Sequence, residues 1–441
     1  MKSDNSPPAL SGDLRPGSED REVSLHRHPK MNIALILRWF YPQVTGIITQ
    51  HMRYAPFLAS ENIYFVVDTL QTPEMEHAPS LVNEIRIFRH SVDLKALAGN
   101  SSNLDLELFT RAIRRWEDEG QYPDVIILFS HSRALLPGIL WARKRGIPCV
   151  FSASNYPEGY GSSLYLRLKH YMASWVMMRF YESVYVYSGL QGKVYEQIGA
   201  SKAQITVIPF GVDGEQFRAP AHDAEKQALR RRLELPEDCP LVVYLGSVVE
   251  RKGADLLLKA WETVSKAVPS AVLVFVGPYG NRDTFVDRAE RESHHAFLKR
   301  FEQELQQLEN RESVILTGVV QNPQEYLRAG DLFAFPSRSE GFGGVVLEAM
   351  ASELPCVLTP YEGFPEVEFG REGSEHVKVG FQPDEIAATI IELLRSPEER
   401  SRLGRNARRF VCEELGLDKV ARKMANALRR IAAPPRSRKG K

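Results

Sequence analysis

Short apolar segments alternate with longer amphipathic ones along most of this 441-residue chain. The apolar segments are rich in β-branched and aromatic residues and have the length of buried strands, and a helical pattern covers residues 47–60. Strands that alternate with helices predict βαβ units and parallel sheets, so we expect an α/β fold. The predicted strands are NIALIL, IYFVVDT, IRIFRH, VIILFS, PCVFSA, SVYVYS, ITVIPFG, LVVYLGS, AVLVFVG, VILTG, LFAFPS and PCVLTP.

A polar segment with Gly and Pro interrupts this alternation from Gly211 onward. The chain is too long for one ordinary core, so we place a domain boundary there. Pro-Cys-Val begins a strand pattern in each half. The alternation, the linker and this repeat together indicate two Rossmann-like domains with a ligand-binding cleft between their strand ends. The predicted divisions are a disordered tail at 1–30, an N-terminal domain at 31–212, a C-terminal domain at 213–400, terminal helices at 401–432 and a basic disordered tail at 433–441.

Composition excludes several classes of protein. Lys plus Arg and Asp plus Glu number 56 each, so net charge gives no reason to expect a nucleic-acid partner. The four cysteines form no CxxC pair of the kind that binds zinc, which favours a reduced, cytoplasmic compartment. No run of about 18 apolar residues can span a bilayer, and the N-terminus lacks the apolar centre of a signal peptide. We therefore expect a soluble protein that is not exported.

Two glutamates lie eight positions apart in SRSEGFGGVVLEAMA, around a loop with three glycines. Ser337 and Glu340 have the spacing of a capping box, which would begin a helix at Arg338. The glycines oppose this reading, because each destabilises a first helical turn by roughly 0.5–1 kcal/mol relative to alanine. We expect the helix to begin near Gly344, with Glu340 on a loop whose free amides can bind an anion.

The second glutamate, Glu348, lies in a helix that is otherwise apolar on every face. A buried carboxylate is costly without a partner. That partner is an internal basic group, backbone amides or the hydroxyl groups of a ligand. The stretch itself leaves a structural role and a ligand-binding role equally open.

A pair of cations marks a second candidate site, in LGSVVERKGADLLL. Arg251 and Lys252 follow a predicted strand and precede Gly253 and a helix, where they suit a diphosphate leaving group. The alternative is a solvated surface turn. Gly46 follows the first strand in FYPQVTGIITQH, where the chain can approach a phosphate. No G-x-G-x-x-G follows any predicted strand, which opposes a dinucleotide-dependent oxidoreductase.

Polar residues at two further strand ends are candidate sugar contacts. His131 ends IILFSHSR, while Ser154 and Asn155 end FSASN. A lone histidine is more often structural than functional. The segment at 162–183 is predicted to be an amphipathic helix in which basic residues lie beside aromatics. It packs on the core or, in the minority reading, contacts a membrane surface.

Together these motifs resemble the family 4 retaining glycosyltransferases, which have the GT-B fold and use nucleotide-sugar donors. The resemblance covers about residues 31–430. SRSEGFGGVVLEAMA is similar to the family's E-x7-E signature, and ERKGADLLL is similar to its diphosphate-binding turn. ITVIPFGVDGEQF is similar to the segment that enters its interdomain linker. AGDLFAFPS and GFPEV match the usual surroundings of these motifs in the family. The resemblance implies two Rossmann-like domains facing an interdomain cleft, an acceptor domain first and a donor domain second, and terminal helices that pack back towards the first.

The resemblance also implies a role for each candidate residue. Glu340 would lie beside the donor sugar, and Glu348 would bind the ribose hydroxyls. Lys252, with Arg251 near it, would stabilise the departing nucleoside diphosphate. The backbone around the donor would comprise Gly46, Gly341, Phe342, Gly343 and Gly344.

Three positions depart from the family pattern. Thr45 stands where a glycine is common, Ser247 where an arginine is usual, and Ser154 with Asn155 where a histidine is common. Ser154, Asn155 and Ser247 motivate one alternative, an inactive nucleotide-sugar-binding subunit of a glycosyltransferase pair. A nucleotide-sugar epimerase on the same fold is a weaker alternative.

The leading prediction is transfer of a hexose, with retention of configuration, from a nucleotide diphosphate sugar to an acceptor hydroxyl. The acceptor is an unidentified saccharide or lipid-linked molecule, in polysaccharide, glycolipid or glycoconjugate synthesis. The expected catalytic residues are Glu340, Arg251 and Lys252, and no metal cofactor is expected. The expected location is the cytoplasm, including the inner face of the membrane.

Overall fold

The structure, a computed structural model, describes residues 29–41, 45–71, 77–92, 101–153, 156, 172, 174–280 and 288–433. Almost all of the two predicted tails lies outside these residues. So do Ser154, Asn155 and most of the predicted helix at 162–183.

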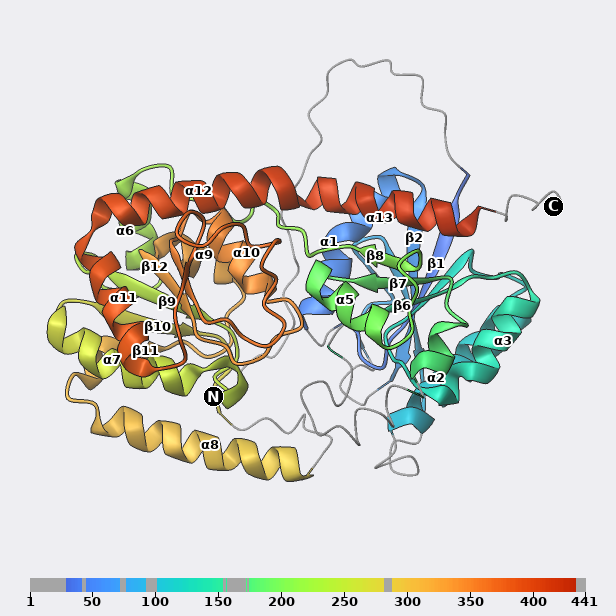
Figure 1. The fold of residues 1–441 in the computed structure, drawn as a ribbon, viewed down its shortest axis with the longest axis horizontal. Coiled ribbons are helices and arrows are strands. Elements are labelled where there is room, and N and C mark those ends of the chain that lie inside the picture. Colours follow the sequence, from blue (N-terminus) through green and yellow to red (C-terminus); the bar gives the residue numbers. More distant parts are fainter. Residues whose placement is uncertain are drawn as a thin grey trace, which may run out of the picture.

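Two sheets form the centres of two α/β units that lie next to each other along the long axis of the molecule (Figure 1). The first sheet has the strand order β3-β4-β2-β1-β5-β6-β7-β8, and the second has the order β11-β10-β9-β12-β13-β14. The strands of the first sheet are β1 (Met31–Ile36), β2 (Ile63–Leu70), β3 (Leu81–Val82), β4 (Ile85–His90), β5 (Val125–Leu128), β6 (Cys149–Ser152), β7 (Ser183–Val186) and β8 (Ile205–Val207). Those of the second are β9 (Leu241–Leu245), β10 (Val272–Val276), β11 (Val314–Leu316), β12 (Leu332–Phe335), β13 (Cys356–Leu358) and β14 (Val377–Lys378).

The two sheets share one topology. Without the edge strands β3 and β8, each runs 3-2-1-4-5-6 in chain order, the order of a Rossmann fold. The repeated Pro-Cys-Val begins β6 in one sheet and β13 in the other, which are corresponding strands. The predicted fold class, two Rossmann-like α/β units, is confirmed. One pairing departs from the predicted parallel arrangement, because β3 pairs with β4 in a short antiparallel hairpin.

Helices cover both faces of each sheet. In the first unit, one face packs against α1 and α13, and the other against α2 and α3. In the second unit, one continuous core joins the sheet to helices α6 to α12. The helices are α1 (Gly46–Ser60), α2 (Ser101–Glu119), α3 (Leu136–Lys144), α5 (Gly189–Gln197), α6 (Asp223–Arg232), α7 (Ala254–Ala267), α8 (Arg288–Gln307), α9 (Pro323–Ala329), α10 (Gly344–Ala351), α11 (Pro383–Arg395), α12 (Pro397–Leu415) and α13 (Leu417–Ala432).

The chain crosses between the units twice, at nearly the same place. The first crossing is the linker at 208–217, and the second is Gly416, between α12 and α13. Val212 pairs with both sides of Gly416: its amide donates to Leu415 O at 2.9 Å, and its carbonyl accepts from Leu417 N at 2.9 Å. Consequently α12 lies on the second unit and α13 on the first, and they follow one another along one edge of the molecule (Figure 1).

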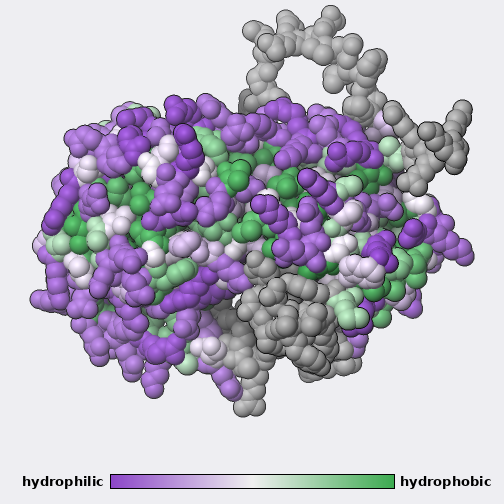
Figure 2. Space-filling view, viewed as in Figure 1, coloured by the Kyte–Doolittle hydropathy of each residue, from purple (hydrophilic) through white to green (hydrophobic). Residues whose placement is uncertain are grey.

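The surface seen in Figure 2 is hydrophilic over most of the described residues. Among the helices of the described ranges, none is both long enough and apolar enough to cross a bilayer. All four cysteines are free. Of the predicted helix at 162–183, the described end exposes Met172, Trp175 and Val176, while Met177 and Met178 are buried in the first unit.

Candidate active site

The loop between β12 and α10 has the predicted form. Helix α10 begins at Gly344, and Glu340 lies on the loop before it. No helix begins at Arg338, so the capping-box reading is wrong. Instead of capping a helix, the Ser337 hydroxyl donates to Glu340 Oε1 at 3.2 Å.

Both predicted cations meet this glutamate. Lys252 Nζ donates to Glu340 Oε1 at 2.9 Å, and Arg251 Nη1 lies 3.2 Å from the same oxygen. The side chains of Lys252 and Glu340 are only 16% and 11% exposed, whereas that of Arg251 is 53% exposed. They meet because β9 and β12 are parallel neighbours, so the segments that follow them leave the same edge of the sheet. The predicted catalytic residues therefore form one cluster.

Backbone contacts hold the cationic turn against the glutamate loop. The turn is a short 3-10 helix, Glu250–Lys252, and it ends at Gly253 with a φ of 69°. A Cβ atom on Gly253 would lie 1.8 Å from the carbonyl oxygen of Pro336. Arg338 N donates to Arg251 O at 2.8 Å, and the Arg338 guanidinium makes two hydrogen bonds to the Asp255 carboxylate. The spacing of Lys252 and Glu340 is thus set by the main chain.

Packing explains two of the glycines in the glutamate loop. Gly343 has a φ of 91°, and a Cβ atom there would lie 2.4 Å from the Tyr361 hydroxyl, which donates to Phe342 O at 2.6 Å. A Cβ atom on Gly344 would lie 2.7 Å from the ring of Phe210, in the linker. Packing within the protein is therefore enough to require glycine at both positions. The two glycines are not independent support for a phosphate site.

The second glutamate has a basic partner in the other unit. Arg53 Nη1, on α1, donates to Glu348 Oε1, on α10, at 2.8 Å. Of the three partners predicted for Glu348, the internal basic group is the one observed. Gly46 is exposed at the first turn of the same helix α1, where Thr45 accepts a hydrogen bond from Ile48 N.

Two further contacts join the units. The rings of Phe210 and Phe342 stack with their centres 5.2 Å apart. Glu368, in the second unit, accepts from Gly189 N at 2.9 Å, at the start of α5 in the first unit. A carboxylate at a helix N-terminus is favourable because it faces the positive end of the helix dipole.

His131 lies in an aromatic environment. It follows β5, and its ring lies 4.9 Å from that of Phe151 and 5.8 Å from that of Tyr181. Both ring nitrogens are buried and lack a hydrogen-bond partner in the described part of the chain. Burial lowers the pKa of His131 to about 4, so the ring is neutral at pH 7. Its role as a sugar contact stays a prediction.

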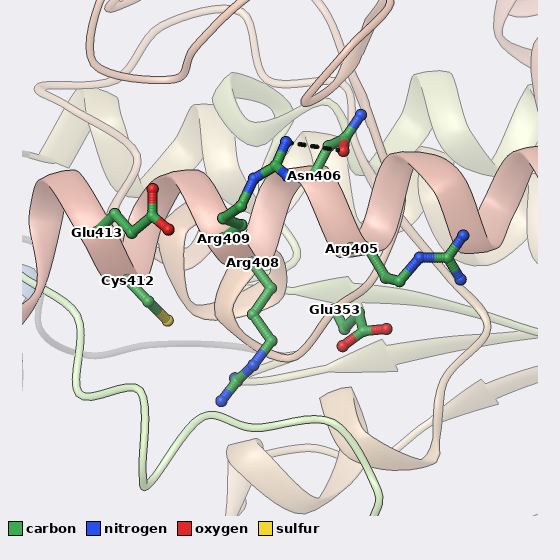
Figure 3. A pocket seen from close by; sticks show the side chains of 7 residues that line it. All are labelled: Glu353, Arg405, Asn406, Arg408, Arg409, Cys412 and Glu413. Carbon is green, nitrogen blue, oxygen red and sulfur yellow. Dashed lines mark hydrogen bonds between the residues drawn. The ribbon is translucent and has the colours of Figure 1, made fainter.

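A surface pocket lies elsewhere, along α12 (Figure 3). Arg408 reaches inward from this pocket and donates to the carbonyls of Ala351, Phe217 and Gly214, so it holds the linker against α10. None of the predicted site residues lines this pocket. It is lined by Glu353, Arg405, Asn406, Arg408, Arg409, Cys412 and Glu413.

The sequence reasoning missed Arg53, Phe210, Tyr361 and Glu368. A helical arginine or a buried aromatic residue carries no local pattern that predicts a partner in the other domain. The only available signal was the requirement that Glu348 have a partner, which did not say where that partner lies.

Two family models match the chain in succession. A model described as "Glycosyl transferase 4-like domain" matches residues 45–211, and one described as "Glycosyl transferases group 1" matches residues 225–410. Each model matches less than half of the chain, and both describe glycosyltransferase domains. Both matches agree with the resemblance to glycosyltransferases that the motifs carry.

Curated relatives match this chain over part of their length. One is the GDP-mannose-dependent monoacylated alpha-(1-6)-phosphatidylinositol monomannoside mannosyltransferase of Corynebacterium glutamicum, 31% identical over 50% of this chain and 55% of the relative. Another is the D-inositol 3-phosphate glycosyltransferase of Xylanimonas cellulosilytica, 32% identical over 51% of each. The chain spans about half the length of the curated relatives it matches.

Solved structures match this chain over nearly its whole length. Sucrose-phosphate synthase from Thermosynechococcus elongatus matches with a TM-score of 0.73 and 20% identity, covering 91% of this chain and 99% of that one. Anabaena HepE in complex with UDP and glucose matches with a TM-score of 0.70 and 17% identity, covering 90% and 99%. These similarities confirm the GT-B fold.

Proposed function

We propose that this glycosyltransferase moves a hexose from a nucleotide diphosphate sugar to an acceptor hydroxyl. The observation that carries the proposal is the cluster of Glu340, Lys252 and Arg251 at neighbouring strand ends of the second unit. Two relatives support a nucleotide-sugar donor, since the Corynebacterium enzyme is named for GDP-mannose and HepE was solved with UDP. The acceptor is assigned only as a saccharide or lipid-linked hydroxyl.

A diphosphate can replace Glu340 as the partner of the two cations. Without ligand, one carboxylate oxygen of Glu340 receives both cations. A diphosphate carries more negative charge and more acceptor oxygens than a carboxylate, so it competes for Lys252 and Arg251. Once bound to it, the two cations would stabilise the negative charge that develops on the leaving group. Glu340, released from them, would orient the sugar or stabilise its developing positive charge.

We assign a retaining displacement on one face of the sugar. The bond from the anomeric carbon to the β-phosphate oxygen breaks, and a bond from that carbon to the acceptor oxygen forms on the same face. The acceptor proton passes to the leaving phosphate oxygen, so no separate base is needed. Glu348 would bind the ribose, which places the two glutamates at opposite ends of one donor. The proposal uses no metal ion.

A nucleotide-sugar-binding subunit without transferase activity is the second candidate. Ser247, which stands where the family commonly has an arginine, favours it, because the leaving group would then have one cation fewer. The two candidates differ in turnover rather than in nucleotide binding.

Glu340→Gln separates them. We expect turnover to fall by about 10²–10³-fold, the loss seen when one preorganised electrostatic contact is removed. Binding of the free nucleoside diphosphate should stay equal or tighten, because the carboxylate no longer competes for Lys252. Turnover is measured as release of UDP, GDP or ADP from the corresponding hexose donors, and binding by calorimetry.

The matched control is Glu262→Gln, which removes an exposed carboxylate paired with Lys266 on α7 and should leave both quantities unchanged. Tight nucleotide binding without turnover by the wild-type protein, across all donors and a range of acceptors, would favour the binding subunit. Failure of every nucleotide to bind would overturn both candidates.

A further inference from the structure

Arg53 links three parts of the molecule. It lies on α1 of the first unit, and its Nη1 donates to Glu348 Oε1 on α10 of the second. The guanidinium carbon lies 5.0 Å from the centre of the Phe217 ring, a fully buried residue of the linker. The side chains of Arg53 and Glu348 are only 19% and 13% exposed, so this ion pair is shielded from bulk water.

The helix that carries Arg53 is fixed to the linker by its neighbours on the same face. Gln50 Nε2 donates to Gly211 O at 3.0 Å, and the Tyr54 hydroxyl donates to Pro209 O at 3.0 Å and accepts from Gly211 N at 3.0 Å. Residues three and four positions apart lie on one side of a helix. The Arg53 side chain therefore originates in the first unit, beside the linker, whereas its acceptor belongs to the second unit.

Glu348 is left with one uncommitted oxygen. Oε1 accepts from Arg53, while Oε2 has no hydrogen-bond partner among the described residues. Most of its neighbours along α10, including Val346 and Leu347, are buried and apolar. A carboxylate can accept several hydrogen bonds, so Oε2 is available to a hydroxyl group while Oε1 stays bound.

We propose that Arg53 is a positioning residue for the nucleotide ribose. It holds Oε1 of Glu348 across the domain boundary, so that Oε2 faces the ribose hydroxyl in a fixed orientation. The inference rests on the proposed function, because it takes a nucleotide as the ligand. It adds that the first unit, and not the donor-binding unit alone, determines how tightly the ribose is bound.

The energetic consequence is a coupling between Arg53 and one ribose hydroxyl. If the ion pair of Arg53 and Glu348 were only structural, breaking it would lower the stability of the protein. It would also weaken the binding of every nucleotide by the same factor. A positioning residue instead makes the contribution of the hydroxyl depend on the arginine, which a double-mutant cycle between residue and ligand detects.

The test measures the affinities of UDP, GDP and ADP, each with its 2′-deoxy and 3′-deoxy forms, by calorimetry. In the wild-type protein, removal of the bound hydroxyl should weaken the preferred nucleotide about 10-fold, as expected for a hydrogen bond to a charged group. In Arg53→Met, which keeps an apolar chain over Phe217, that penalty should fall to about 3-fold or less. Arg53→Lys keeps the charge but not the guanidinium geometry, and should restore part of the penalty.

Arg429→Met is the matched control, because Arg429 also joins parts distant in sequence: it pairs with Glu61 at 2.7 Å but lies on α13. The Arg429→Met variant should leave the deoxy penalty, which is the loss of affinity on removal of the ribose hydroxyl, at its wild-type value. If Arg53→Met does not fold, Arg53→Gln provides the same loss of charge with a hydrogen-bond donor retained.

Three outcomes overturn the inference at different levels. An unchanged deoxy penalty in the folded neutral variant refutes the role of Arg53 alone. No deoxy penalty in the wild-type protein refutes ribose binding by Glu348 as well, while nucleotide binding stands. No binding of any nucleotide refutes the proposed function itself.

Discussion

Burial determines the charge of His51, a core residue of α1. Its ring lies 5.2 Å from that of Phe129 and 5.6 Å from that of Phe65, and its Nδ1 donates to Ile47 O at 2.8 Å. Burial lowers the pKa of His51 to about 4, against a small opposing effect of that hydrogen bond. The ring is therefore neutral in the folded protein at pH values where an unfolded histidine is already charged.

His51 should make the protein less stable in acid. Between pH 6.5 and pH 4 the unfolded chain binds a proton at this residue and the folded chain does not, so the free energy of unfolding falls as the pH falls. At pH 5 the loss relative to pH 7 is about 2 kcal/mol for a pKa lowered by this amount. His51→Phe, which suits the aromatic surroundings, should remove that part of the pH dependence in urea unfolding curves. His295→Gln, an exposed position on α8, should leave it intact.

Residue positions differed in how far the sequence could predict them. Lys252 and Glu340 were predictable, because each lies in a short segment whose turn and glycine pattern fixes its place at a strand end. Arg53 was not predictable, because its partner is 295 positions away and no local pattern connects the two. At Gly343 and Gly344 the sequence did not reveal that Tyr361 and Phe210 exclude a side chain, and the contact of these glycines with a donor stays a prediction.

At the scale of elements, the cationic turn and the glutamate loop pack closely against each other. They follow neighbouring strands, and the carbonyl of Pro336 lies where a side chain on Gly253 would be. Most strands and the start of α10 were predicted because their patterns are long or contain glycines that oppose a helix. The strands β3 and β14 were missed, because two residues are too few for a recognisable pattern.

Gly253→Ala should separate the turn from the loop. Its φ of 69° is strained for alanine by about 1 kcal/mol, and the contact with Pro336 O adds to this because backbone must move. Gly373→Ala is the matched control, since its φ is 74° but its Cβ would meet nothing within 4 Å. We expect the control to lose about 1 kcal/mol in the free energy of unfolding and to keep nucleotide affinity. Gly253→Ala should lose more stability and bind the nucleoside diphosphate more weakly; equal losses in both variants would contradict the tight contact.

At the scale of the whole molecule, the two units differ in how many stretches of the chain build them. The second unit is built from one continuous stretch of chain up to α12, whereas the core of the first includes α13, from the other end of the chain. The buried residues of α13 that complete this core are Leu417, Val420, Ala421, Met424, Ala425, Ala427 and Leu428. The alternation of strands and helices predicted both units, but the placement of α13 came from the family resemblance, since periodicity shows only that a helix has an apolar face.

Met424→Ala tests whether α13 belongs energetically to the first unit. Truncation of a buried methionine should cost about 2–5 kcal/mol. Hydrogen exchange followed by mass spectrometry should show faster exchange in α1 and β1, with β9 and β10 unaffected. Lys423→Ala, an exposed neighbour on the same helix, should change neither. Faster exchange confined to the second unit would contradict the assignment.

The crossing at Gly416 has a consequence for the order in which the protein is made. The ribosome synthesises the first sheet early, but the helix that covers part of one face emerges only after about two hundred further residues, including the whole second sheet, have been added. Until then the apolar surface of α1 and β5 that packs against α13 has no cover, and it can bind other nascent chains or a chaperone. Of the two units, the one that is translated earlier is therefore the later to complete its core.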